Sequence, residues 1–358
     1  MKKRNILIIV ALTLIAAVGF IVFGEKEADK HEVLAKDLKE SSATAMVPVL
    51  NVPMTDQNLL YCVTFQLAWN ELMDNVIKED IILGTEKVYS TELNLQKFTK
   101  SSLSDADYIA MVGMGKDDIV KRINDEMDRK FNEEDKWKVE SEVGPDDYLA
   151  FSFLKKVLTF ETSFEKVEEG LDFKGTKVAS FGIMDVKDPE TAQKLRDQVE
   201  LVHYVSDDEF IIRLKDSDEK EDLFLARLPK EETLEGMLEK AETLVSEPIP
   251  LTSYDRLNIP LIAFDIKKSY KEFIGQPVMN KGFESYSIGE ALQRIEFILN
   301  ESGAVLKSKA EIMMPTSMPM DPKSLILDDS FLLYMKETGK QEPYLAIYVD
   351  NAEILQTR

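Results

Sequence analysis

The chain has 358 residues, of which 44% are hydrophobic and 31% are charged, a composition typical of a globular protein with one large or two small domains. Its formal net charge of −22 argues against nucleic-acid phosphates and anionic membrane surfaces as partners. The single cysteine, Cys62, excludes an intramolecular disulfide framework and a cysteine-based zinc site. The chain has only two histidines, His31 and His203. Histidine-based catalysis and histidine-based metal binding are therefore not expected.

An apolar run near the N-terminus predicts a segment that interacts with a membrane. The run extends from Ile6 to Phe23, follows the basic sequence MKKRN and precedes charged residues. Residues 1–24 are therefore expected to form a transmembrane anchor or a long signal peptide. No A-x-A cleavage site is evident, which favours the uncleaved anchor. Because basic residues stay on the cytoplasmic side, the rest of the chain is expected outside the membrane, anchored at the cell surface or secreted.

The chain after this segment is expected to divide into a linker and one domain. Residues 25–50 are charged and only weakly apolar, which is typical of a linker. Residues 51–358 carry the periodic patterns of helices and strands. An oxidising exterior combined with a single cysteine suits a bacterial surface protein that does not rely on disulfides.

The first half of the domain is predicted to contain its main helices. Residues 58–76 are apolar around most of a helical circumference, which predicts a central helix. Residues 108–114 predict a short strand. A second helix is expected to begin at residues 116–118, and its apolar stripe is formed by Ile119, Ile123 and Met127.

Strands are predicted to dominate the last two-thirds of the chain. The aromatic residues of 148–164 favour a long strand, and residues 209–215 and 222–229 predict a hairpin joined by an acidic loop. Thr233 is expected to cap a helix with apolar residues at core spacing. Further strands are predicted at 178–186, 201–206, 258–266, 330–336 and 344–350. Helices followed by strands indicate the α+β class.

Residues 287–322 have the most unusual pattern in the chain. They begin as an alternating strand and turn at residues 301–303. Alternation then resumes over residues 304–312, with Ala304, Leu306, Ser308 and Ala310 on one face. The segment ends in MMPTSMPMDP, whose three prolines cannot lie in a central strand. The sequence thus predicts a buried strand, a turn, a strand-capable segment and an extended exposed segment.

Known catalytic and cofactor motifs do not occur in this sequence. It contains no glycine-rich phosphate loop, H-E-x-x-H, C-x-x-C or G-x-S-x-G motif. No nucleophile and base can be paired from the pattern. The chain is therefore not expected to be an enzyme, and no metal or cofactor is expected.

In order, the elements resemble those of the serpin family, most clearly from Asp117 to the C-terminus. The sequence ALQRIEFILNESGAVLKSKA is similar to the serpin strand that leads into the reactive-loop hinge, with Glu301, Gly303 and Ala304 at the hinge positions. About thirty residues later, DDSFLLYM resembles the strand that follows the loop, although Ser330 replaces a proline. The spacing is similar to that of a full-length reactive loop.

Further residues match or depart from the family pattern. FLKKVLTFETSFE is similar to a central sheet strand that carries a tryptophan and a phenylalanine, here Phe160 and Phe164. Ser152 falls where serpins have a buried asparagine, and Gln293 falls on the histidine of the shutter, the region in which the sheet opens. The two shutter serines fall on Cys62 and Phe65. The resemblance also implies that one or two early elements are reduced or missing.

The resemblance implies an α+β fold with a large mixed sheet, further β-sheets, helices packed around them and an exposed reactive-type loop. In serpins a protease cleaves this loop, and its hinge side inserts as a new strand in the main sheet. The inserting segment would carry Leu306, Ser308 and Ala310, and the scissile bond would lie near Ser317 and Met318. The chain would be a divergent, bacterial-type member.

The implied function is inhibition of a serine or cysteine protease by a monomer that needs no cofactor, binds no nucleic acid and meets the membrane only through its N-terminal segment. The alternative is a non-inhibitory serpin-fold binding module at the cell surface. Leu306 is bulkier than the alanine usual in the family, and Lys307 and Lys309 would oppose insertion if they were buried without partners. A third interpretation, in which 304–312 form an ordinary edge strand or a fixed loop, is also consistent with the alternation.

Overall fold

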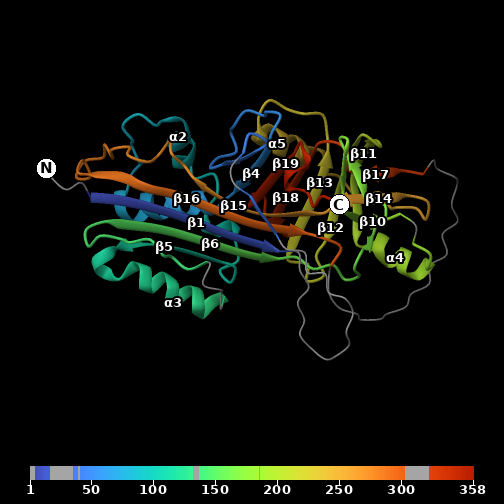
Figure 1. The fold of residues 1–358 in the computed structure, drawn as a ribbon, viewed down its shortest axis with the longest axis horizontal. Coiled ribbons are helices and arrows are strands. Elements are labelled where there is room, and N and C mark those ends of the chain that lie inside the picture. Colours follow the sequence, from blue (N-terminus) through green and yellow to red (C-terminus); the bar gives the residue numbers. More distant parts are fainter. Residues whose placement is uncertain (1–4, 17–34, 39–40, 132–136, 185, 303–321) are drawn as a thin grey trace.

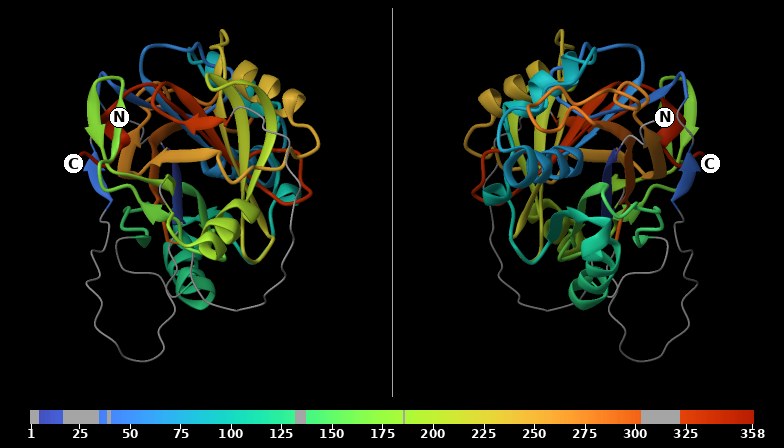
Figure 2. Two further views of the ribbon diagram at one scale, coloured as in Figure 1. Left: turned by 90° about the vertical axis from the view of Figure 1, so that its right-hand side faces the viewer. Right: turned by 90° about the vertical axis from the view of Figure 1, so that its left-hand side faces the viewer.

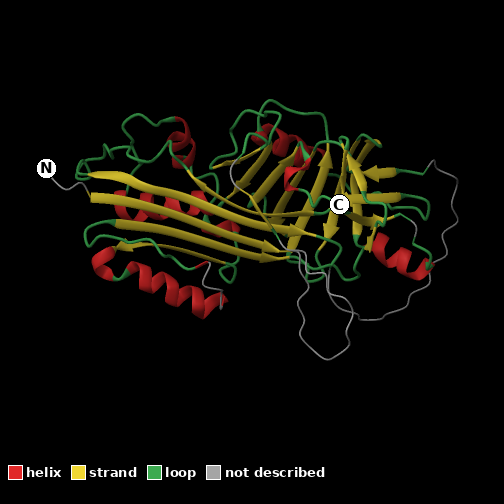
Figure 3. Cartoon of the chain, viewed as in Figure 1, coloured by secondary structure: helices red, strands yellow, loops and turns green. Residues whose placement is uncertain are grey.

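The structure is a computed structural model that describes residues 5–16, 35–38, 41–131, 137–184, 186–302 and 322–358. Long strands cross one half of the molecule, shorter strands fill the other, and helices pack around them (Figure 1, Figure 3). The main sheet has six strands, in the order β2 (Lys36–Leu38), β15 (Ile262–Ser269), β16 (Tyr286–Leu299), β1 (Asn5–Ala16), β6 (Tyr148–Val157) and β5 (Tyr108–Met114).

Three further sheets complete the strand framework. The second sheet has seven strands, in the order β11 (Val199–Ser206), β12 (Glu209–Lys215), β13 (Glu221–Arg227), β18 (Phe331–Glu337), β19 (Leu345–Val349), β4 (Asn58–Cys62) and β3 (Thr44–Val47). The third sheet has four, in the order β17 (Ser324–Ile326), β14 (Arg256–Pro260), β10 (Ser180–Ile183) and β7 (Glu165–Lys166). The fourth pairs β8 (Leu171–Phe173) with β9 (Thr176–Val178).

Helices cover these sheets from several sides. They are α1 (Thr64–Leu72), which continues as a π-helical turn (Met73–Ile77), α2 (Val88–Asn94), α3 (Ile119–Phe131), α4 (Pro189–Asp197) and α5 (Leu234–Leu244). In the views of Figure 2, α3 and α5 lie on opposite sides of the strands. Helix α1 contacts β1, β5 and β6 of the main sheet, and α3 contacts β5 and β6.

β1 lies at the centre of the main sheet and runs parallel to both of its neighbours. It is formed by residues 5–16, from the region expected to be an anchor or a signal peptide. The placement has a physical reason, because a continuous apolar run is also the pattern of a strand buried on both faces. Within the described residues, no helix combines the length and apolar character needed to cross a membrane. A membrane role for residues 1–24 stays a prediction.

Two short strands from the region expected to be a linker pair with strands of the main and second sheets. β2 pairs with β15 at one edge of the main sheet, and β3 pairs with β4 at one edge of the second sheet. Met46 and Val47 are buried. Apolar side chains close to residue 50 therefore pack into the domain that was expected to begin at residue 51.

The expected helix over residues 58–76 is correct only in its second part. Residues 58–62 form β4, which pairs with β19 on one side and β3 on the other, and the helix begins at Thr64. All five residues of β4 are buried. Apolarity on every side therefore reflects a strand enclosed on both faces before the helix begins, a case that periodicity cannot separate from a buried helix.

Amphipathic elements were predicted more accurately than buried ones. The stripe Ile119, Ile123 and Met127 is the buried face of α3, as expected. Thr233 caps α5, since its hydroxyl oxygen accepts a hydrogen bond from the backbone N–H of Gly236 at 3.0 Å. The predicted hairpin is formed by β12 and β13. The long strand expected over residues 148–164 ends at Val157, and residues 258–266 divide between β14 and β15 in two different sheets.

Candidate functional site

The candidate site is the central position of the main sheet, meaning the space between β16 and β6, together with the turn at the end of β16. β1 fills this position, and its side chains point alternately to the two faces of the sheet. Leu7, Ile9 and Ala11 join the large core on the α1 side. Ile8, Val10 and Leu12 join a separate core that includes the buried stripe of α3. Both faces of the central position are thus covered.

A polar cluster lies on the α1 side of the central position, around the predicted shutter residue Gln293. The Gln293 side-chain amide donates hydrogen bonds to the carbonyl oxygen of Cys62 at 3.0 Å and to the Thr64 hydroxyl at 3.1 Å. Its amide oxygen accepts one from the Tyr270 hydroxyl at 2.6 Å. The Thr13 hydroxyl of β1 lies 2.8 Å from the Thr64 hydroxyl. Gln293 therefore links β16 to the segment that begins α1, and β1 is joined to the same cluster.

The thiol of Cys62 belongs to this cluster but is poorly suited to act as a nucleophile. Its sulfur lies 3.3 Å from the Thr13 hydroxyl oxygen. Burial raises the pKa of the Cys62 thiol, which outweighs the opposing effect of hydrogen bonds from Thr13 and Thr64. The thiol is therefore held in its protonated form, the less nucleophilic of its two states.

Ser152 and Gln293 lie on opposite sides of β1. In the register of the sheet, Ala11 is opposite Gln293 of β16 on one side and opposite Ser152 of β6 on the other. Ser152 is fully buried, and its hydroxyl has no hydrogen-bond partner within the described residues. The smallest side chain of the buried part of β1 thus lies between two polar neighbours.

The two predicted aromatic residues lie at the end of β16, where the hinge begins. Phe160 and Phe164 are buried and pack edge to face, with ring centroids 5.0 Å apart. The backbone N–H of Phe164 donates to the carbonyl oxygen of Glu301 at 2.9 Å. The Glu301 carboxylate forms an ion pair of 2.9 Å with Lys166, whose own side chain is largely exposed. The structure therefore brings Glu301, Phe160 and Phe164 into one region.

The remaining predicted loop residues lie outside the described residues. They are Gly303, Ala304, Leu306, Ser308, Ala310, Ser317 and Met318. The described chain on either side is fixed in place. It leaves β16 next to Phe164 and resumes at residue 322, and the backbone N–H of the following Lys323 donates to the carboxylate of Asp255 at 2.7 Å. Residues 303–321 thus connect the end of β16 to β17 in the third sheet.

A buried ion cluster joins the same end of the main sheet to the second sheet. Lys156 of β6 is 1% exposed, and its ammonium contacts the carboxylates of Asp107 and Glu221 at 2.8 Å each and that of Glu337. The Tyr344 hydroxyl donates to the other oxygen of Glu221 at 2.7 Å. Lys156 is opposite Ile15 of β1 in the sheet register. The cluster therefore fixes β6 beside the end of β1.

The three carboxylates of this cluster could in principle hold a metal ion, because their oxygens lie within 4.8 Å of one another. However, the Lys156 ammonium contacts all three of them, so the positive charge among them comes from the protein itself. Burial raises the pKa of Glu221 to about 7, against the opposing effect of Lys156. The cluster is therefore better described as a structural ion network than as a metal centre.

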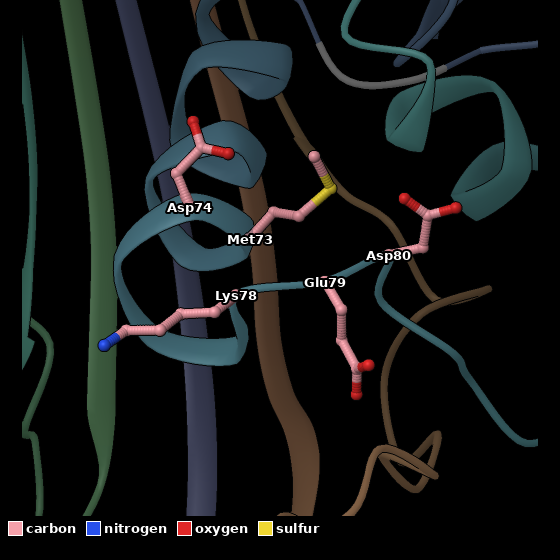
Figure 4. Close-up of a pocket in the computed structure, with 5 residues that line it drawn as sticks. All are labelled: Met73, Asp74, Lys78, Glu79 and Asp80. Carbon is pink, nitrogen blue, oxygen red and sulfur yellow. The ribbon is translucent and has the colours of Figure 1, made fainter.

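A surface depression beside the end of α1 does not bring a set of reactive groups together. It is lined by Met73, Asp74, Lys78, Glu79 and Asp80. In Figure 4 the charged ends of Lys78 and Asp80 point to opposite sides, and Glu79 points in a third direction. This arrangement offers no pair of groups that could act together on a substrate.

Several residues of the candidate site were missed by the sequence analysis. Thr64 lies within the segment that was expected to be helical, between the two positions matched to shutter serines, so the resemblance offered a signal for it. Thr13 and Lys156 gave no such signal. Thr13 lies in the apolar run assigned to the membrane, and the partners of Lys156 are distant in the sequence.

Comparison with known proteins finds similarity in structure but not in sequence. No protein-family model and no curated protein sequence matches the chain. A highly specific serpin of the insect Tenebrio molitor matches with 11% identity and a TM-score of 0.40, over 79% of this chain and 94% of that one. Uncleaved ovalbumin matches with 12% identity and a TM-score of 0.45, over 82% and 93%. Native protease nexin-1 with heparin matches with 11% identity and a TM-score of 0.44, over 80% and 97%.

These similarities concern the arrangement of the chain alone. The protein has an α+β fold, with a large mixed sheet, further β-sheets and helices packed around them, as the sequence predicted. The expected reactive-type loop lies outside the described residues, and its properties stay predictions.

Proposed function

We propose that this protein is a serpin-like inhibitor of a serine or cysteine protease, a divergent, bacterial-type member that acts by loop cleavage and strand insertion. The proposal assigns residues 303–321 as the reactive loop, with cleavage near Ser317 and Met318. After cleavage, the hinge side would fold back from Glu301 and enter the central position of the main sheet. The protein itself would act as a monomer without a cofactor.

The observation that carries the proposal is the way the main sheet is assembled around its centre. β16 and β6 are parallel, and neither pairs with the other, because β1 from the opposite end of the chain lies between them. The outer edges of β16 and β6 are occupied by β15 and β5. The sheet thus accepts a separate strand at its centre, and residues 303–321 leave from the end of β16 that borders this position.

The contacts at the hinge are compatible with its movement. Glu301 is held by one backbone hydrogen bond from Phe164 and by an ion pair with the exposed Lys166. An ion pair with an exposed partner contributes little net stability in water, typically about 0–1 kcal/mol. Insertion also requires that β1 leave the central position, because one strand already pairs with both inner edges.

The test is to mix the full chain with a panel of serine and cysteine proteases and to separate the products on denaturing gels. The wild type is compared with Val10→Asp, which places a carboxylate in a buried position and should expel β1. Asn5→Asp is the matched control, since it adds the same charge at a half-buried position at the start of β1. A protease-linked band in the wild type or in Val10→Asp is the expected result.

A second measurement compares melting temperatures before and after loop cleavage. An inserted strand should raise the melting temperature by about 5 °C or more, because 1 kcal/mol shifts it by roughly 2–4 °C in domains of 150–250 residues. Simple cleavage by every protease, with no linked band and no rise in either form, would rule out inhibition by insertion.

The alternative function is a non-inhibitory serpin-fold binding module, and one observation favours it. β1 already completes the main sheet and is buried on both faces, so the folded chain has no open central position. In such a module the cleaved loop would stay outside the sheet. Unchanged melting temperatures after cleavage in both the wild type and Val10→Asp would support this function over inhibition.

We further propose that residues 1–24 place the domain outside the cytoplasmic membrane, as an anchor or a signal peptide. The support is the apolar run after MKKRN. A chain whose residues 5–16 lie in a membrane cannot also contain β1, so the anchored and strand-containing forms exclude each other. Digestion of intact cells with an external protease tests the location, and complete protection of the domain would contradict it.

A further inference from the structure

We propose that β1 is a built-in regulator of loop insertion: it is the specific occupant of the central position, and its release switches the inhibitor on. The inference rests on the proposed function and adds to it the step that controls it. Four features of β1 carry the inference: its pairing, its burial, its register and its exclusion of any other strand.

The pairing of β1 uses both inner edges of the central position along their length. On one side, residues 5–16 pair with β16 from Tyr286 to Ile298. On the other side, residues 7–16 pair with β6 from Tyr148 to Val157. A strand offers hydrogen-bonding groups on two edges only, and β15 and β5 occupy the outer ones. A second inserted strand therefore has no edge available until β1 leaves.

The burial of β1 matches the two different surroundings above and below the sheet. Ile8, Val10 and Leu12 pack in the core that contains α3, and Leu7 and Ile9 pack in the core that contains α1. Each of these five side chains is at most 5% exposed. The segment thus fills hydrophobic space on both faces, as a permanent strand of the sheet would.

A polar contact sets the register of β1. The Thr13 hydroxyl meets Thr64 and Cys62 in the cluster around Gln293, and Ala11 lies between Gln293 and Ser152. A shift by one residue would turn Thr13 to the opposite face and bring a leucine to the polar cluster. Only one alignment satisfies both the polar and the apolar contacts, which distinguishes a specific occupant from a merely apolar segment.

The position of Thr13 allows a direct test with the single native cysteine. Its side-chain oxygen lies 3.3 Å from the Cys62 sulfur, so Thr13→Cys places a second thiol within reach of Cys62 for a disulfide. Full-length Thr13→Cys is folded under oxidising conditions, digested and examined by mass spectrometry for a peptide pair that links position 13 to Cys62. Thr13→Ser and the double variant Thr13→Cys/Cys62→Ser are the matched controls.

The expected result is an intramolecular link in most molecules of Thr13→Cys, absent from both controls and removed by a reductant. Two free thiols in the folded monomer, or links only between molecules, would overturn the proposed place of β1. This part of the test does not depend on the loop.

The controlling role of β1 is tested by cleaving the loop in four forms of the full chain. Val10→Asp should gain melting temperature on cleavage, the wild type and Asn5→Asp should gain clearly less, and disulfide-linked Thr13→Cys should gain nothing. An equal gain in the linked and Val10→Asp forms would overturn the inference. If no form gains melting temperature on cleavage, loop insertion fails as a function, whereas a disulfide between position 13 and Cys62 still supports β1 as the specific central strand.

Should Val10→Asp not fold, Gly289→Ala is the milder variant, since an added Cβ would lie 2.0 Å from Ile6 of β1.

Discussion

Lys156 illustrates how a single side chain can join two sheets. Its ammonium contacts Asp107, Glu221 and Glu337, so three carboxylates surround one positive charge. Burial lowers the pKa of Lys156, but the charge of Glu221 and hydrogen bonds to all three acids raise it by more, so the net shift is upward. The cluster carries excess negative charge when all three acids are ionised, and burial raises the pKa of Glu221.

The raised pKa of Glu221 predicts that this residue stabilises the folded protein more at mildly acidic pH than above about pH 7. The folded pKa is about 7 and the ordinary value is 4.5, so between these values the folded chain binds more protons than the unfolded one. The stability from this group is complete below about pH 4.5 and is lost as the pH rises through about 7, with a maximum of roughly 3 kcal/mol.

Urea unfolding at about pH 5 and pH 8 measures this effect. The free energy of unfolding of the wild type should fall more between the two pH values than that of Glu221→Gln, whose side chain stays neutral. Parallel changes in the two proteins would contradict the assignment of the titration to Glu221.

At the scale of elements, the alignment of β1 with β16 can be tested at one glycine. The register shifts between Leu7 and Ile8, which are opposite Ile288 and Glu290, so Gly289 is left without a partner. A Cβ added to Gly289 would lie 2.0 Å from the Cγ2 atom of Ile6. The absence of a side chain at this position therefore allows β1 to approach.

Gly289→Ala is predicted to destabilise the protein by about 1–3 kcal/mol, the usual cost of overpacking. The same substitution should cost much less in an Ile6→Ala background, because the colliding methyl group is then absent. Urea unfolding of the four proteins in this double-mutant cycle gives the interaction energy. Equal costs in both backgrounds would show that β1 does not lie against Gly289.

The sequence predicted those elements whose pattern differs between their two faces. The stripe of α3 and the cap of α5 at Thr233 are local signals, and the structure confirms both. β1 and β4 are apolar on every side, and an anchor, a buried helix and a buried strand share that pattern. Only the partners on either side decide among them, and for β1 these are β16 and β6, far along the chain.

The residues of the candidate site also divide into those that the sequence predicted and those that depend on distant partners. The resemblance matched Phe160 and Phe164 to a central sheet strand and Gln293 to the shutter. The structure places the two phenylalanines after the end of β6, where Phe164 meets Glu301, and places Gln293 in the polar cluster beside Cys62 and Thr64. The contact between Thr13 and Thr64 could not be predicted, because Thr13 belonged to a segment assigned to a different environment.

At the scale of the whole molecule, the net charge of −22 is the dominant electrostatic feature. Acidic side chains outnumber basic ones by 66 to 44, so many carboxylates have no cation to balance them. Like charges brought together by folding repel one another and oppose the compact state.

The protein is therefore predicted to gain stability with ionic strength, on the order of 1 kcal/mol between about 20 and 500 mM salt, because salt screens this repulsion. Urea unfolding in NaCl measures the gain, and KCl should give the same result because screening does not depend on the identity of the cation. A loss of stability would instead show that screened surface ion pairs outweigh the repulsion.

The pairing of β1 also has a consequence for biosynthesis. Residue 5 pairs with residue 286, so β1 finds one of its two neighbours only after the long stretch of chain between them has been made. At about 5–20 residues per second, this delay lasts some tens of seconds. During that time the apolar segment is available to other partners, including the translocation machinery. The pairing of β1 with β16 is therefore completed long after β1 itself has been synthesised.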